Sequence, residues 1–93
     1  MIFSKYRIKA KGNFFNMGFG FSCMQLAFKN DFTGTLFYES AESVILEITG
    51  REEDIINVID IWKREDYISN IHILFKTKTE NKLTDFIMLN QIN

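Results

Sequence analysis

The sequence predicts an α+β fold, a ferredoxin-like sandwich in which two helices cover one face of an antiparallel five-stranded sheet. Three observations lead to this prediction. The 93 residues are enough for one domain and too few for two. Apolar residues alternate in some segments and follow helical spacing in others. These segments occur in the order β-α-β-β-α-β plus a C-terminal strand, which suits that fold. A single domain is expected over residues 1–93.

The first strand is expected over residues 5–11, KYRIKAK, where polar and apolar residues alternate strictly. A period of two places the apolar side chains on one face of a half-buried strand and the basic ones on the other. Gly12 ends this strand, and a loop rich in glycine and phenylalanine continues through Gly18.

The first helix is expected over residues 21–30, FSCMQLAFKN, with Phe21, Met24 and Phe28 among its apolar positions. Phe21 is expected in the core beneath the sheet, together with Phe19, because large apolar side chains are usually buried. Two extended runs then follow, TGTLFYE and SVILEIT, and the short turn between them predicts a hairpin.

The clearest helix is expected over residues 51–65, REEDIINVIDIWKRE. Ile55, Ile59 and Trp62 recur at i, i+4 and i+7 and mark its buried face. Its first turn is acidic and its last turn is basic, as the helix dipole favours. The segment NIHILFKTKT predicts a further strand, and DFIML predicts a last short one.

Composition and charge argue against several classes of function. The net charge is −1, so no electrostatic footprint of a nucleic-acid partner is visible. The single Cys23 and the single His72 argue against a metal site, and no cofactor is expected. The N-terminus has no long apolar run, and no segment approaches the length of a transmembrane helix. A cytoplasmic protein without membrane contact is therefore expected.

The stretch NMGFGFSC, residues 16–23, places two glycines beside two phenylalanines. Gly18-Phe19-Gly20-Phe21 matches the core of an RNA-recognition motif. In that motif the match lies on the third strand, whereas here it follows the first, so RNA binding is not expected. A dinucleotide-binding fingerprint would need a third glycine where Cys23 stands, so this motif is rejected as well. Glycines between a first strand and a first helix instead suit an anion, because successive backbone N–H groups converge on it there.

On these residues the sequence resembles the acylphosphatase family, whose loop reads Gly-x-Val-Gln-Gly-Val-Gly-Phe-Arg. The aligned residues are Gly12, Asn13, Phe14, Phe15, Asn16, Met17, Gly18, Phe19 and Gly20. The identical ones are Gly12, Gly18 and Phe19. The family's second segment begins Gly-Trp-Val-x-Asn and ends in Gly, and it fits residues 34–50 without a gap. The resemblance covers nearly the whole chain and implies an acylphosphatase-like ferredoxin sandwich.

The resemblance assigns the family's chemistry to two side chains, and both are replaced here. An arginine that closes the loop holds the phosphate of the acyl phosphate, and an asparagine on the second strand orients the attacking water. The arginine position is Gly20 and the asparagine position is Tyr38. Glycine cannot supply the fork of hydrogen bonds that guanidinium gives to phosphate, and tyrosine is far larger than asparagine.

Two functions therefore stay open. The first is a pseudoenzyme, a hydrolase homologue without efficient acyl phosphate hydrolysis, which binds phosphate or another small anion or contacts a protein partner through the aromatic loop at Phe15. The second is a divergent acylphosphatase that uses Lys11 and Tyr38 as substitutes. Asn16 replaces a family glycine but tolerates positive φ, so the turn can be kept. A basic group over the loop would favour the enzyme, and an apolar lining would favour the binding protein.

Overall fold

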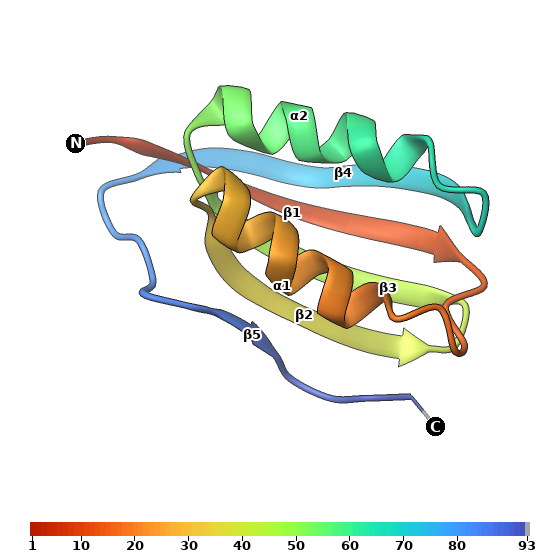
Figure 1. The fold of residues 1–93 in the computed structure, drawn as a ribbon. Helices are drawn as coiled ribbons and strands as arrows, with labels where there is room; N and C mark the ends of the chain where they lie inside the picture. The colour runs from red at the N-terminus through yellow and green to blue at the C-terminus, as the bar shows by residue number, and fades with distance from the viewer. Residues whose placement is uncertain (93) are drawn as a thin grey trace.

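The computed structural model describes residues 1–92; Asn93, the last residue of the predicted domain, lies outside the described residues. A five-stranded sheet in the order β4-β1-β3-β2-β5 has both helices on one face (Figure 1). The elements are β1 Phe3–Gly12, α1 Phe19–Asn30, β2 Thr33–Ser40, β3 Ser43–Gly50, α2 Glu52–Lys63, β4 Ile68–Thr79 and β5 Phe86–Met88. The predicted α+β class and element order are confirmed. Neither helix of this described part is long and apolar enough to cross a membrane.

The prediction of a purely antiparallel sheet is wrong at one edge. β1 to β4 pair antiparallel, but β5 pairs with β2 in parallel, with Gly34 opposite Phe86. The connection after β4 crosses one end of the sheet to the opposite edge, where the chain turns back (Figure 1). Because β5 reverses the direction of β4, and β4 is antiparallel to β1 and therefore to β2, β5 must run parallel to β2.

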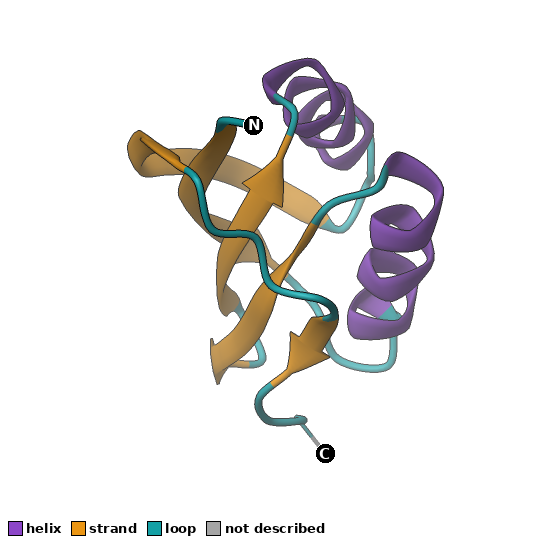
Figure 2. Cartoon of the chain, turned by 90° about the vertical axis from the view of Figure 1, so that its left-hand side faces the viewer, coloured by secondary structure: helices purple, strands orange, loops and turns teal. Residues whose placement is uncertain are grey.

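The core lies between the sheet and the two helices, as the view along the layers shows (Figure 2). The alternation expected in β1 is confirmed, because Tyr6, Ile8 and Ala10 are all buried. The predicted buried face of α2 is confirmed as well. Trp62 is 1% exposed and is among the largest fully buried side chains of the described chain.

Helix α1 buries a different face from the one expected. Phe19 is buried as predicted, but Phe21 is 66% exposed, so its expected place in the core is wrong. The buried residues of α1 are Phe19, Gly20, Cys23 and Ala27. Positions 19, 23 and 27 follow a spacing of four and face the sheet, and position 21 is rotated from position 19 by about 200°. Apart from Phe19, the buried residues of α1 are small.

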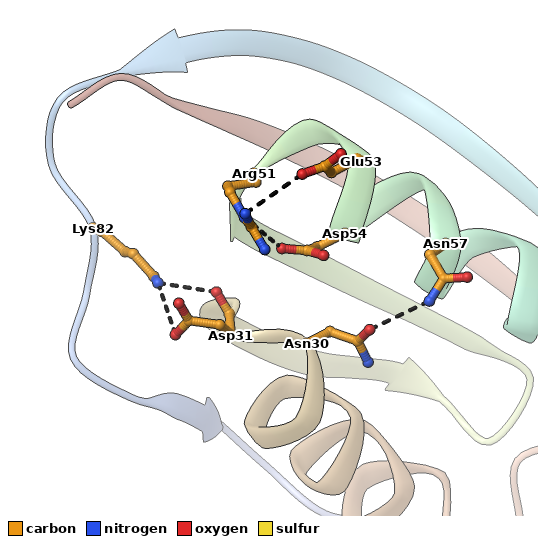
Figure 3. A network of polar contacts seen from close by, with 7 residues as sticks. All are labelled: Asn30, Asp31, Arg51, Glu53, Asp54, Asn57 and Lys82. Atoms are coloured by element: carbon orange, nitrogen blue, oxygen red, sulfur yellow. Dashed lines mark hydrogen bonds and ion pairs between the residues drawn. The ribbon is translucent and has the colours of Figure 1, made fainter.

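A network of polar contacts closes one end of the sandwich (Figure 3). Asn57 of α2 donates a hydrogen bond of 3.3 Å to the side-chain oxygen of Asn30 in α1. Lys82, in the connection between β4 and β5, donates to the backbone and side-chain oxygens of Asp31 at 2.9 and 3.1 Å. These exposed contacts fix the end of α1 against α2 and the crossing connection, although exposed pairs add little to stability.

Candidate functional site

The loop between β1 and α1 is tied to neighbouring segments where it leaves the sheet. The Asn13 N–H donates to the Tyr67 carbonyl at 2.8 Å, and the Phe14 N–H donates to the Ala41 carbonyl at 2.8 Å. A Cβ at Gly12 would collide with the Tyr67 carbonyl oxygen. Glycine is therefore required at position 12 for the close approach of the two backbones.

The turn into α1 uses left-handed backbone at two residues. Asn16 has φ 58 and Gly18 has φ 66, and Gly18 is the N-cap of the helix. Asparagine and glycine tolerate this conformation best, so Asn16 keeps the turn as expected. The backbone N–H groups of Phe15, Asn16, Gly18 and Phe19 have no hydrogen-bond acceptor within residues 1–92. They are available to an anion at the helix N-terminus.

Tyr38 of β2 reaches the first turn of α1. The Gly20 N–H donates a hydrogen bond of 3.1 Å to the Tyr38 hydroxyl oxygen. Burial raises the pKa of Tyr38 above its ordinary value of 10.0, although the bond from Gly20 acts in the opposite direction. The phenol is therefore protonated near neutral pH. Its own O–H has no acceptor among the described residues and stays available as a donor.

Asn90 holds the backbone of Tyr38 from the other side. Its side-chain oxygen accepts from the Tyr38 N–H at 2.7 Å, and its side-chain nitrogen donates to the Tyr38 carbonyl at 2.8 Å. The amide thus takes the place of a strand partner for β2 beyond the end of β5. This contact draws residues 89–92 towards the loop. Sequence reasoning missed it, because a lone asparagine near the end of the chain gives no signal of such a role.

A pocket of about 230 Å³ lies between the loop, the first turn of α1 and the segment after β5. Its lining residues are Phe14, Asn16, Gly18, Phe19, Gly20, Phe21, Tyr38, Met88, Gln91 and Ile92. The structure thus brings five of the predicted loop residues together with Tyr38. Within residues 1–92, no lysine or arginine lines this loop pocket.

Lys11, the suggested substitute cation, lies on the open face of the sheet, on the opposite side from the buried residues of β1. Lys9 shares this face, and its Nζ is 3.2 Å from a carboxylate oxygen of Glu39. The Ser43 hydroxyl, and then Lys9 and Lys11, hold the pKa of the Glu39 carboxyl below its ordinary value. The structure therefore does not bring Lys11 to the loop pocket.

The aromatic residues of the loop belong mainly to the core. Phe14 is 1% exposed, and its ring centroid lies 4.9 Å from that of Phe19 and 6.4 Å from that of Tyr38. Phe19 continues the cluster to Trp62, with 5.9 Å between the centroids. Phe15 is different, because it is 46% exposed. The loop pocket therefore has rigid aromatic walls, while the ring of Phe15 is half exposed to solvent.

No family model matches the sequence, and no curated protein matches it either. Solved structures do match the fold. The full-length HypF structure in its phosphate- and nucleotide-bound form has a TM-score of 0.78 and 21% identity, over 97% of this chain and 12% of HypF. An acylphosphatase from Coxiella burnetii has a TM-score of 0.75 and 18% identity, over 92% of each chain. The BLUF structure of BlrP1 has a TM-score of 0.78 and 9% identity, over 97% of this chain and 66% of the other.

These likenesses show that the fold is acylphosphatase-like, as the resemblance implies. The chain spans only about an eighth of HypF, but it matches the acylphosphatase over nearly the whole of both chains. A BLUF structure shares the same arrangement at still lower identity. Because folds of this kind serve several functions, the function must be inferred from the loop pocket itself.

Proposed function

We propose that this chain is an acylphosphatase-like domain that binds a small organic anion in the loop pocket and does not hydrolyse acyl phosphates efficiently. The proposal rests on the contact between Gly20 and Tyr38. The position aligned with the family's arginine has no side chain, and its N–H already donates to the Tyr38 hydroxyl at 3.1 Å. A phosphate at this place would lack both the guanidinium and this backbone donor.

The expected loss of rate follows from the chemistry of the missing groups. Removing one preorganised donor to a transition state lowers the rate by about 10²–10³-fold. Here the aligned arginine and the aligned asparagine are both replaced, although the two losses need not multiply. Lys11 lies on the other face of the sheet and does not line the loop pocket, so the divergent enzyme gains no support from its position.

The chemistry of the pocket suits an anion with a single charge and an apolar body. Its available donors are neutral, namely backbone N–H groups of the turn and the O–H of Tyr38. A dianion that enters such a site without a cation loses its hydration with little compensation, and a monoanion loses less. The side chains of Phe14, Met88 and Ile92 supply apolar walls. An aromatic or aliphatic carboxylate combines these features.

The first experiment measures turnover of benzoyl phosphate by this protein, beside the Coxiella burnetii acylphosphatase under the same conditions. We expect a rate at least about 100-fold lower for this chain. A rate within about tenfold of the enzyme, which corresponds to roughly 1.4 kcal/mol in barrier, would contradict the loss of hydrolysis.

The second experiment follows binding of benzoate and of inorganic phosphate by titration calorimetry. Benzoate should bind more tightly than phosphate, and Tyr38→Phe should weaken it by about three- to tenfold, as the loss of one hydrogen bond implies. Tyr67→Phe is the matched control, because it also removes a phenol hydroxyl but Tyr67 does not line the loop pocket. Tighter binding of phosphate, or equal effects of the two substitutions, would contradict the proposed ligand.

A further inference from the structure

The outer side of α1 is apolar, which is the reverse of the usual arrangement in a surface helix. Phe21, Met24 and Phe28 are 66%, 44% and 91% exposed. They are spaced i, i+3 and i+7, so they lie along one side of the helix. The side facing the sheet has mostly small residues, and the larger apolar side chains therefore project into solvent.

Met17, in the turn just before α1, is a further apolar residue of this surface and is 46% exposed. We call Met17, Phe21, Met24 and Phe28 the α1 stripe. With about 200 Å² for each large side chain, their exposed fractions amount to roughly 500 Å² of apolar surface. That is close to the largest patch of a typical monomer. It also equals the apolar share of the ~800 Å² that each partner of a standard interface buries.

We propose that the α1 stripe is the interface of a twofold homodimer in which two copies of α1 pack antiparallel. A twofold interface must be complementary to itself. The midpoint between Phe21 and Phe28 falls between Met24 and Gln25. An axis there places Phe21 of each copy against Phe28 of the other, with Met24 at the centre. The exposed apolar area is what such a dimer needs on each side.

The surface beside Phe28 can also receive a projecting side chain. One hollow of about 340 Å³ has a mixed lining of apolar and polar residues, namely Met24, Ala27, Phe28, Phe32 and Phe86 with Asp31, Thr33, Thr84 and Asp85. A second hollow of about 410 Å³, on the other side of Phe28, is lined by Met24, Gln25, Phe28 and Lys29. A ring that projects next to a hollow with partly apolar walls provides both halves of a self-complementary contact.

Charge is compatible with this arrangement. Lys29 is the only charged residue of α1, and it lies near the C-terminal end of the helix. In an antiparallel pair the two lysines lie at opposite ends of the interface, so like charges do not face one another. This inference concerns the outer side of α1. Phe28 does not line the loop pocket, so its substitution tests the dimer separately from the proposed function.

Sedimentation velocity from about 1 μM to 1 mM tests the proposal, and the wild type should shift from monomer to dimer in this range. Phe28→Glu should raise the dimer dissociation constant at least about 30-fold, because a twofold interface contains each buried anchor twice. Phe28 is 91% exposed, so the substitution leaves the fold intact, which circular dichroism checks. The control is Phe37→Glu on β2, which is 44% exposed outside the stripe and should leave the dissociation constant unchanged.

A cysteine pair tests the position of the axis. Met24→Cys should form an intermolecular disulfide on mild oxidation, whereas Ile56→Cys, which is 47% exposed on α2, should not. The native Cys23 is buried and does not compete. A chain that stays monomeric over the whole range, or a dimer that Phe28→Glu leaves intact, would overturn the proposal. A dimer in which Ile56→Cys cross-links faster than Met24→Cys would overturn the antiparallel arrangement.

Discussion

The hydroxyl of Tyr38 accepts a hydrogen bond of 3.1 Å from the backbone N–H of Gly20, which joins β2 to the first turn of α1. The sequence resemblance aligns these two positions with the asparagine and the arginine to which it assigns the chemistry of acylphosphatases. The first N–H groups of a helix have no acceptor within the helix and must find one elsewhere. Here a side chain from a strand 18 residues away supplies it. The two positions on which the proposed function rests therefore form a direct contact between β2 and α1.

This contact predicts the effect of removing one oxygen atom. Tyr38→Phe leaves the ring in place but leaves the buried Gly20 N–H without an acceptor, so the free energy of unfolding should fall by about 1–2 kcal/mol. Tyr67→Phe serves as the control, because the Tyr67 hydroxyl makes no hydrogen bond within residues 1–92, and its effect should stay below ~0.5 kcal/mol. Urea denaturation measures both. Equal losses in the two variants would mean that the hydrogen bond contributes nothing specific.

The strands and α2 could be predicted from the sequence because the spacing of their apolar residues fits only one buried face. Alternation in β1 leaves a single choice of buried face, namely Tyr6, Ile8 and Ala10. The apolar residues of α1 instead surround the helix, so spacing alone did not favour the correct face. The structure buries the small side chains of Cys23 and Ala27 and leaves Phe21 exposed.

The loop lies between β1 and α1, where its glycines and its order in the chain placed it, but the contacts that line the pocket were not foreseen. The Gly20–Tyr38 hydrogen bond joins residues 18 apart, and the Asn90–Tyr38 contacts join residues 52 apart. Local sequence patterns report on neighbours within a helix or strand, and these pairs depend on the packing of separate elements. The position of Lys11 followed from alternation, once the buried face of β1 was known.

The three tyrosines predict the stability of the fold at alkaline pH. Burial, and then the charge of Glu65, raise the pKa of Tyr67 to about 12, and burial also raises those of Tyr6 and Tyr38. A raised pKa in the folded state means that folding favours the protonated phenol. This contribution is complete below the unfolded pKa of about 10 and is lost as pH rises towards 12.

The free energy of unfolding should therefore fall with pH above about 10, since the unfolded chain then binds fewer protons than the native one. Ultraviolet titration of tyrosinate, in the native chain and in urea, checks this directly. The native curve should lie at higher pH than the unfolded curve. Tyr67→Phe should remove the highest-pH part of that difference, and coincident native and unfolded curves would contradict the prediction.

Trp62 offers a test of the core that separates packing from hydrogen bonding. It is 1% exposed, its ring packs against Phe19 at 5.9 Å, and its indole N–H has no partner in the described chain. Trp62→Ala should lower the free energy of unfolding by about 3–5 kcal/mol, because it leaves a large cavity. Trp62→Phe keeps part of the packing and removes the unpaired N–H, so it should cost under about 2 kcal/mol. Urea melts decide, and a loss under ~1 kcal/mol for Trp62→Ala would mean that the core contact is unimportant.

The last prediction asks whether substitutions in the loop pocket can give it phosphate chemistry. Gly20→Arg would supply a fork for phosphate, and Tyr38→Asn would supply a contact for water. Gly20 has no positive φ, so the backbone accepts a side chain. A Cβ at that position would, however, collide with the sulfur of Met88. Met88→Ala is therefore needed as well, because it removes the far end of that side chain.

We expect the triple variant Gly20→Arg, Tyr38→Asn, Met88→Ala to bind inorganic phosphate. It should turn over benzoyl phosphate at least tenfold faster than the wild type, which corresponds to a barrier lower by only about 1.4 kcal/mol. Recovery should be partial, because Phe15 and Asn16 still differ from the family loop. Variants that lack either the arginine or the asparagine should stay near the starting rate, since a positioned water is useless unless the phosphate is held in line with it. Met88→Ala alone is the control for the opened pocket. A folded triple variant with neither phosphate binding by calorimetry nor added turnover would contradict the prediction that these three positions keep the loop pocket from acting on acyl phosphates.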